Sequence, residues 1–307
     1  MTTDTTSPPP VTAELLTVRD WLRWSVSRFQ AEKLFFGHGS DNAYDEAAYL
    51  ILHRLHLPLD RLEPFLDARL TLAERQDLWA FLHRRIEQRL PAAYLTQEAW
   101  LGDFRFFVDE RVIVPRSYFG ELLETGLSPW LDAPEMVSSA LDLCTGSGCL
   151  AILMAHAFPQ AAIDAVDISP DALAVATINV ADYGLTEQIR LVQSDLFRQL
   201  SGQRYDLIVC NPPYVTAAAM ADLPAEYRHE PGLALAAGQD GLDIVRRLLG
   251  EAADHLNDDG LLFVEVGHNA EIVDAAFPDL ALTWIDTPSS EGKIFLLTRE
   301  QLLDQSA

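Results

Sequence analysis

Four consecutive residues in the second half of the chain, Asn211-Pro212-Pro213-Tyr214, could hold an N–H group. They directly follow the apolar run 207–210, which is typical of a buried parallel strand. Neither proline has an N–H to donate, and each disfavours helix in the residue before it. The backbone therefore stays extended, and its carbonyl groups remain available as acceptors. This pattern suits a site that binds an amino or amide nitrogen; the alternative is a turn that only ends a strand.

Three earlier strand ends also carry groups that could bind a ligand. Residues 142–149 form a turn whose glycines allow close approach of the backbone. Alone, such a turn could bind a dinucleotide, another cofactor or nothing, and Cys144 stands where a pyrophosphate fingerprint requires its first glycine. Asp167 ends the next strand, at about the distance where a carboxylate accepts from ribose hydroxyls, although it could instead cap a helix, as could Ser169. Asp195 follows the third strand, so four successive strand ends supply ligand-type groups.

The elements that position these residues alternate between strand and helix. Seven apolar runs predict strands, at residues 140–143, 163–166, 189–192, 207–210, 261–266, 282–285 and 294–297. Helical patterns lie between most of them, at residues 149–157, 171–183, 242–256 and 270–277. This alternation predicts an α/β fold with a seven-stranded, doubly wound sheet. In such sheets ligands bind beyond the carboxyl ends of the strands, near the point where the strand order reverses.

The first part of the chain predicts a separate small domain. Apolar residues recur at helical spacing up to about residue 90, and the histidines among them lack the partners of a metal site. Alternating apolar residues at 104–108, a turn at 109–111 and a second apolar run at 112–114 predict a hairpin that joins the domains. We therefore divide the chain into a disordered Thr/Ser/Pro tail, a helical substrate-docking domain, a hairpin linker and a larger α/β domain, at residues 1–10, 11–95, 96–116 and 117–307.

Composition restricts the classes of function. The 307 residues are 49% hydrophobic and carry a net charge of −24. Residues 1–100 hold 14 acidic and 11 basic side chains, whereas residues 101–307 hold 32 and 11, so the larger domain is strongly acidic. Such a charge opposes autonomous DNA binding and favours a basic partner. Three cysteines without paired spacing predict reduced thiols in a cytoplasmic protein with no metal, and no apolar stretch predicts a membrane anchor.

On these motifs the sequence resembles class I S-adenosylmethionine-dependent methyltransferases, and among them the enzymes that methylate glutamine side chains in proteins. The resemblance covers nearly the whole chain, including Glu230-Pro231 and residues 238–243. The family has two branches, which act on peptide-chain release factors and on the third protein of the large ribosomal subunit. Residues 35–39, the 142–148 turn and Pro115-Arg116-Ser117 resemble the ribosomal branch.

The resemblance implies a role for each matched residue. Cys144, Thr145, Gly146, Ser147 and Gly148 would line the methionine end of S-adenosylmethionine, although Cys144 departs from the glycine that is common in the wider superfamily. Asp167 would take the ribose hydroxyls, Ile168 would also contact the cofactor, and Asp195 and Leu196 would border the adenine. Asn211, Pro212, Pro213 and Tyr214 would be catalytic; Asn211 would border the cofactor, and Asn211, Pro212, Tyr214 and Arg116 would bind the substrate. The product would be S-adenosylhomocysteine.

The expected partner is a basic ribosomal protein, either free or in an assembling large subunit. Three alternatives stay open at this point. The enzyme could methylate release factors, or it could methylate amino groups of nucleic acids, which share the planar nitrogen but require a basic surface that the sequence does not show. It could also be a non-catalytic factor for ribosome assembly, although no residue of the motif is lost.

Overall fold

The computed structural model describes residues 11–304 and divides the chain into two compact units. The first unit consists of the chain up to Glu98 together with Pro224–His229, and the second contains Ala99–Leu223 and the chain from Glu230 onward. The expected disordered tail, residues 1–10, lies outside the described residues. The sequence placed domain boundaries at 95/96 and 116/117 and did not anticipate that residues 224–229 belong with the helical unit.

The first unit is helical, as the periodicity predicts. Its elements are α1 (Val11–Glu14), α2 (Val18–Ala31), α3 (Ala43–Arg54), η1 (Glu63–Phe65), α4 (Leu72–Glu87), α5 (Ala92–Thr96) and, from the inserted segment, η3 (Ala225–His229). Short polar side chains begin the longer helices. Thr17 and Thr71 each form a capping box with the acidic residue three positions later, and Asn42 accepts two backbone N–H groups at the start of α3.

A buried charge cluster holds the inserted segment within this unit. Arg85 is 1% exposed and donates to Glu46 at 2.7 Å, to Glu226 at 3.3 Å and to the Phe35 carbonyl at 2.9 Å. Glu226 also accepts the Phe35 N–H at 3.0 Å. Burial raises the pKa of the Glu46 carboxyl, while the Arg85 guanidinium opposes the rise. The cluster therefore ties α3, α4 and η3 together by charge-assisted hydrogen bonds.

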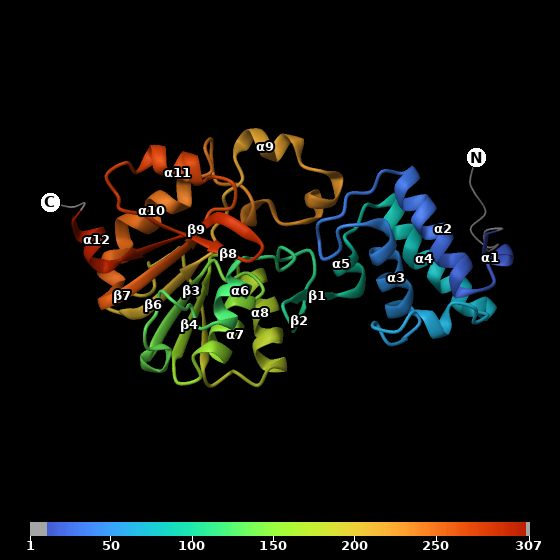
Figure 1. Ribbon diagram of the computed structural model, residues 1–307, viewed down its shortest axis with the longest axis horizontal. Helices are drawn as coiled ribbons and strands as arrows, with labels where there is room; N and C mark the ends of the chain where they lie inside the picture. Colours follow the sequence, from blue (N-terminus) through green and yellow to red (C-terminus); the bar gives the residue numbers. More distant parts are fainter. Residues whose placement is uncertain (1–10, 305–307) are drawn as a thin grey trace. The chain divides into compact units, whose positions relative to one another are not determined.

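The second unit contains a seven-stranded sheet in the order β5-β4-β3-β6-β7-β9-β8 (Figure 1). Its strands are β3 (Ser139–Leu143), β4 (Ala162–Asp167), β5 (Ile189–Gln193), β6 (Tyr205–Cys210), β7 (Leu256–Glu265), β8 (Thr283–Thr287) and β9 (Ser290–Thr298). The first five are parallel, and β9 runs antiparallel to both of its neighbours. The chain passes from β3 to β4 on one side and returns to β6 on the other, so the strand order reverses beside β3.

Helices cover the sheet. Figure 1 shows α7 and α8 against one face, and α10, α11 and α12 on the opposite side. The helices of this unit are α6 (Phe119–Glu124), η2 (Pro134–Met136), α7 (Cys149–Ala157), α8 (Pro170–Asp182), α9 (Ala217–Asp222), η4 (Gly232–Ala234), α10 (Asp243–Glu251), η5 (Ala252–His255), α11 (Ala270–Ala276) and α12 (Arg299–Asp304). A continuous core of buried aliphatic and aromatic residues joins β3, β6 and β7 to α10. The predicted doubly wound α/β fold is confirmed.

Two details of the prediction are wrong. The hairpin pairs β1 (Glu98–Leu101) with β2 (Phe104–Phe107), so its turn lies at Gly102 and residues 112–114 form no strand. Gly102 adopts a φ of +57°, which glycine reaches without strain. The predicted turn at 109–111 does form, with the Val112 N–H donating to the Asp109 carbonyl at 3.1 Å, but it is not the turn of the hairpin. The helix predicted at 242–256 ends at Glu251, because the chain continues as η5 and enters β7 at Leu256. Within residues 11–304, no helix is both long and apolar enough to cross a membrane.

Candidate active site

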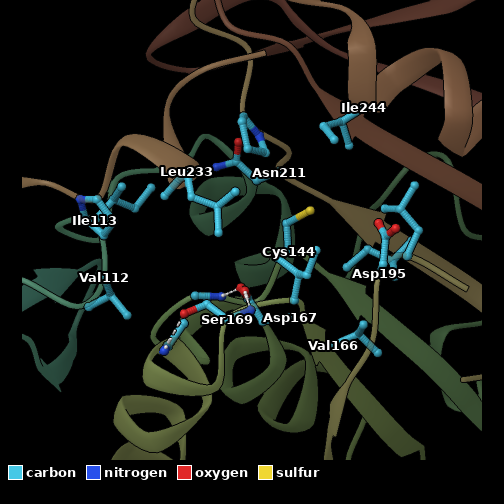
Figure 2. A pocket seen from close by; sticks show the side chains of 18 of the residues that line it. Val112, Ile113, Cys144, Val166, Asp167, Ser169, Asp195, Asn211, Leu233 and Ile244 are labelled. Carbon is cyan, nitrogen blue, oxygen red and sulfur yellow. Dashed lines mark hydrogen bonds between the residues drawn. The ribbon is translucent and has the colours of Figure 1, made fainter. Parts of the chain in front are cut away.

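A cavity of about 290 Å³ opens at the carboxyl edge of the sheet, where the strand order reverses (Figure 2). Residues that follow β3, β4, β5 and β6 form its floor, and segments before α6 and after the 211–214 motif form its walls. The lining residues are Arg111, Val112, Ile113, Leu143, Cys144, Gly146, Val166, Asp167, Ile168, Ser169, Ala172, Ser194, Asp195, Leu196, Asn211, Pro213, Pro231, Leu233, Ala234, Ala236, Ile244 and Arg247. The predicted strand-end groups therefore meet in one place.

Asp167 is fixed by the two turns beside it. Its Oδ2 accepts the Gly146 N–H at 2.9 Å, and its Oδ1 accepts the Ser169 N–H at 2.9 Å. Burial raises the pKa of this carboxyl, and the two backbone N–H groups act against the rise because they stabilise the charged form. Each carboxylate oxygen has a second lone pair, so Asp167 can also accept hydrogen bonds from a pair of neighbouring hydroxyl groups in the cavity.

Asp142, at the end of β3, lies beneath the glycine turn and is fully buried. Its Oδ2 accepts from the Thr145 hydroxyl at 2.5 Å and from the Ala151 N–H at 3.0 Å. Its Oδ1 is buried and has no hydrogen-bond partner among the described residues. Burial raises the pKa of Asp142 to about 7. The Asp167 carboxylate, which can accept from hydroxyl groups, and the largely apolar wall of the cavity fit the ribose and base parts of S-adenosylmethionine.

The part of the cavity around Asp195 includes residues of α10 that the sequence did not reveal. Arg247 donates to Asp195 at 2.8 Å, and Arg198 approaches the same carboxylate at 3.5 Å. Ile244, one turn before Arg247 in α10, also lines the cavity (Figure 2). Asp195 is therefore held in an ion pair at the rim, with apolar surface available next to it for a base.

Several predicted site residues support the cavity without lining it. The Thr145 hydroxyl turns inward to Asp142, the Ser147 carbonyl accepts from Asn179 at 2.8 Å, and Gly148 packs against Ala176. The remaining predicted residues outside the lining are Pro212, Tyr214 and Arg116. Asn211 and Pro213, by contrast, face the cavity directly.

Gly241, Gly267 and Asn269 hold Tyr214 in place. Gly241 lies in a stretch that carries the family resemblance, but the sequence predicted this role for none of the three. The Asn269 side chain donates to the Tyr214 carbonyl at 2.7 Å. A Cβ at Gly267 would lie 2.7 Å from Cε2 of the Tyr214 ring, and one at Gly241 would lie 2.4 Å from the Tyr214 carbonyl oxygen. Both positions therefore require glycine, because any side chain would displace the tyrosine.

Arg116 braces a wall of the cavity. Its guanidinium donates twice to the fully buried Glu230 carboxylate, at 2.5 and 2.6 Å, and that carboxylate also accepts the Val114 N–H at 2.9 Å. Such a bidentate pair fixes direction as well as distance. The segment that follows Glu230 carries Leu233, which is 60% exposed and lines the cavity. The structure thus gives Arg116 a bracing role in addition to the substrate contact predicted for it.

We expect Asp167→Ala to weaken S-adenosylmethionine binding by roughly 1.5–3 kcal/mol, the usual value of hydrogen bonds to a charged group. Titration calorimetry measures this affinity directly. Asp171→Ala is the matched control, because Asp171 is an exposed carboxylate at the start of α8, four residues later in the chain. If wild type and Asp167→Ala bound S-adenosylmethionine with equal affinity, the prediction that Asp167 binds the ribose would be refuted.

The sheet order, the glycine turn and the acidic strand ends define a class I methyltransferase. The model of the "Methyltransferase small domain" family matches residues 127–226. Ribosomal protein uL3 glutamine methyltransferase of Neisseria meningitidis serogroup B is 60% identical over 292 residues, which cover 95% of this chain and 96% of that protein. The enzyme of the same name from Burkholderia pseudomallei is 58% identical over 305 residues, 97% of this chain and 98% of that protein. The chain belongs to the family of ribosomal protein uL3 glutamine methyltransferases.

Among solved structures, the hMettl16 catalytic domain in complex with MAT2A 3′UTR hairpin 6 aligns with a TM-score of 0.49 and 13% identity. The alignment covers 71% of this chain and 78% of that one.

Proposed function

We propose that this chain transfers the methyl group of S-adenosylmethionine to the side-chain amide nitrogen of a glutamine in ribosomal protein uL3, with S-adenosylhomocysteine as the product. The observation that carries this proposal is the full-length match at 60% identity to uL3 glutamine methyltransferases. The presence of Asn211 and Pro213 in the wall of the cavity agrees with it.

The chemistry explains why an amide substrate needs such a wall. An amide nitrogen shares its lone pair with the carbonyl group and is a poor nucleophile. In our proposal the Asn211 side-chain oxygen and the Pro212 carbonyl each accept one N–H of the glutamine amide. These two acceptors point the nitrogen at the reacting carbon and make it more electron-rich. Tyr214, held by Asn269, would cover the amide plane.

The bound S-adenosylmethionine supplies an activated methyl group on a sulfonium, so the protein needs to provide no nucleophile of its own. The protein's contribution is then orientation and a dry environment. Water can remove the surplus proton after transfer, and we assign no general base. His229 does not take that role in our proposal, because its Nε2 lies 2.7 Å from the Gln88 carbonyl oxygen within the helical unit.

The kcat/KM of the purified enzyme, measured with labelled cofactor, should be higher with uL3 as the substrate than with a release factor as the substrate. The acidic charge of residues 101–307 should attract the basic ribosomal protein, so this kcat/KM should also fall as salt is raised from about 50 to 300 mM. A variant of uL3 without the modified glutamine, located by mass spectrometry, is the control. A higher kcat/KM for the release factor would refute the assignment of substrate.

We further propose that the helical unit docks the substrate, either as free protein or within an assembling large subunit, in the cytoplasm. The same assay tests this role with a chimera that carries the helical unit of a release-factor enzyme. Residues 224–229 must be exchanged together with residues 11–90, because Glu226 completes the buried cluster around Arg85. We expect the chimera to bind the cofactor normally and to lose its preference for uL3; an unchanged preference would place docking elsewhere.

A further inference from the structure

Glu265 is a buried carboxylate that the proposed mechanism does not use. It is the last residue of β7 and is 1% exposed. β6 and β7 are parallel, and Cys210 pairs with Val264. Asn211 follows the last residue of β6, and Glu265 follows Val264, so both lie at the carboxyl edge of the sheet. The two side chains are neighbours, because the Asn211 side chain forms a hydrogen bond with the Glu265 carboxylate.

One oxygen of Glu265 is already engaged. Its Oε2 accepts from the Ser117 hydroxyl at 2.6 Å and from the Tyr118 N–H at 3.1 Å. The Ser117 oxygen itself accepts the Phe119 N–H at 3.1 Å, so the hydroxyl proton is available for the carboxylate. Burial raises the pKa of Glu265 to about 7, and the donors Ser117, Tyr118 and Asn211 act against the rise. The three donors favour the ionised form, which predominates above about pH 7 and can only accept hydrogen bonds.

We infer that Glu265 is a positioning residue that sets the orientation of the Asn211 amide. An asparagine side chain has an oxygen that accepts and an NH₂ that donates, and the two ends are nearly equal in size. A carboxylate beside it can accept only from the NH₂ end. The Asn211 oxygen is then directed away from Glu265 and toward the cavity, where the proposed substrate amide presents its N–H groups. In the opposite orientation the Asn211 NH₂ group would face the NH₂ group of the substrate amide, and Asn211 could not accept a hydrogen bond from the substrate.

This inference rests on the proposed function, and Glu265→Gln tests it. Glutamine keeps the volume and one acceptor for Ser117 and Tyr118, but it replaces an acceptor oxygen by a donor. That donor favours the flipped Asn211. We expect kcat for uL3 methylation to fall by about tenfold or more, with KM and cofactor affinity within about twofold of wild type, as for loss of one preorganised contact. Glu121→Gln, in the same unit, is the matched control, because Glu121 accepts the Ser289 N–H near β9.

Two further measurements separate positioning from mere support of the fold. The double variant Asn211→Ala/Glu265→Gln should be no slower than Asn211→Ala, since Glu265 acts through Asn211. Glu265→Ala should lower kcat no more than Glu265→Gln, because alanine leaves Asn211 free to adopt either orientation. Additive losses in the double variant, or a Glu265→Gln enzyme with wild-type kcat, would overturn the inference. A wild-type enzyme that does not methylate uL3 would instead refute the proposed function.

Discussion

Asn211→Ala should lower the single-turnover rate of methyl transfer by roughly 100-fold or more, the typical loss when one preorganised contact to a reacting group is removed. Asn211 lines the cavity beside Cys144 and Pro213, at the end of a strand whose preceding residues are fully buried. Its backbone position is therefore fixed by the sheet, and the substitution removes the side-chain amide together with its hydrogen bond to Glu265. Rapid-quench measurement with saturating labelled cofactor reports the chemical step.

Affinity for S-adenosylmethionine should change little in Asn211→Ala, because the proposed partner of this side chain is the substrate. Asn257→Ala is a suitable control. Asn257 lies near the start of β7 and donates to Asp206 at 2.6 Å, so its loss removes an equivalent side chain from the opposite edge of the sheet. A single-turnover rate of Asn211→Ala within a few-fold of wild type would refute the proposal that Asn211 accepts an N–H of the substrate amide.

The largest stability effect should come from Arg85→Ala. Arg85 is the cation of a cluster in which both carboxylates, Glu46 and Glu226, are at most 2% exposed. Removing it leaves the buried Glu46 carboxylate without its counter-ion and leaves Glu226 with Arg89 alone, at 3.5 Å; breaking such a buried pair typically costs about 3–5 kcal/mol. Loss of packing against the Phe29 and Phe36 rings, each 5.9 Å from the guanidinium carbon, adds to the effect.

Hydrogen exchange measured by mass spectrometry can locate this loss. Peptides from α3 and α4 of Arg85→Ala should exchange faster, while peptides from β3 and β6 should keep wild-type protection. Arg84→Ala is the matched control, because Arg84 is the exposed neighbour on the same helix and should cost less than about 0.5 kcal/mol. Unchanged protection of α3 and α4 in Arg85→Ala would show that the cluster contributes nothing to the helical unit.

The destabilisation by Arg85→Ala should also depend on pH. Burial already raises the folded-state pKa of Glu46 above its ordinary value of 4.5, and removing Arg85 raises it further. A folded state with the higher pKa binds more protons than the unfolded state, so its stability falls as pH rises above about 4.5. The loss relative to wild type should therefore be larger at pH 8 than at pH 5. Urea unfolding followed by tryptophan fluorescence at both values measures this difference.

Local patterns in the sequence were enough to predict the strands and helices of the sheet domain and most of the residues at the strand ends that could bind a ligand. Runs of apolar residues marked all seven strands of the sheet, and the predicted helix at 149–157 agrees with α7. Since the carboxyl ends of parallel strands share one edge, the sequence also predicted that Asp167, Asp195 and Asn211 would approach one another. They line the same cavity. These features depend on side-chain periodicity and on chain direction, and short stretches of sequence determine both.

Only the tertiary structure decided which distant residues support these groups. The pairing of Arg116 with Glu230, and the approach of Gly267 to Tyr214, join positions far apart in the chain. The family resemblance included Arg116 and Glu230, but no local pattern shows which residue each contacts, since a buried glutamate or a close-packed glycine cannot be told from a surface residue or a turn. The membership of residues 224–229 in the helical unit likewise depends on Glu226 reaching Arg85. The free energy of these contacts comes from burial, and burial is a property of the assembled fold.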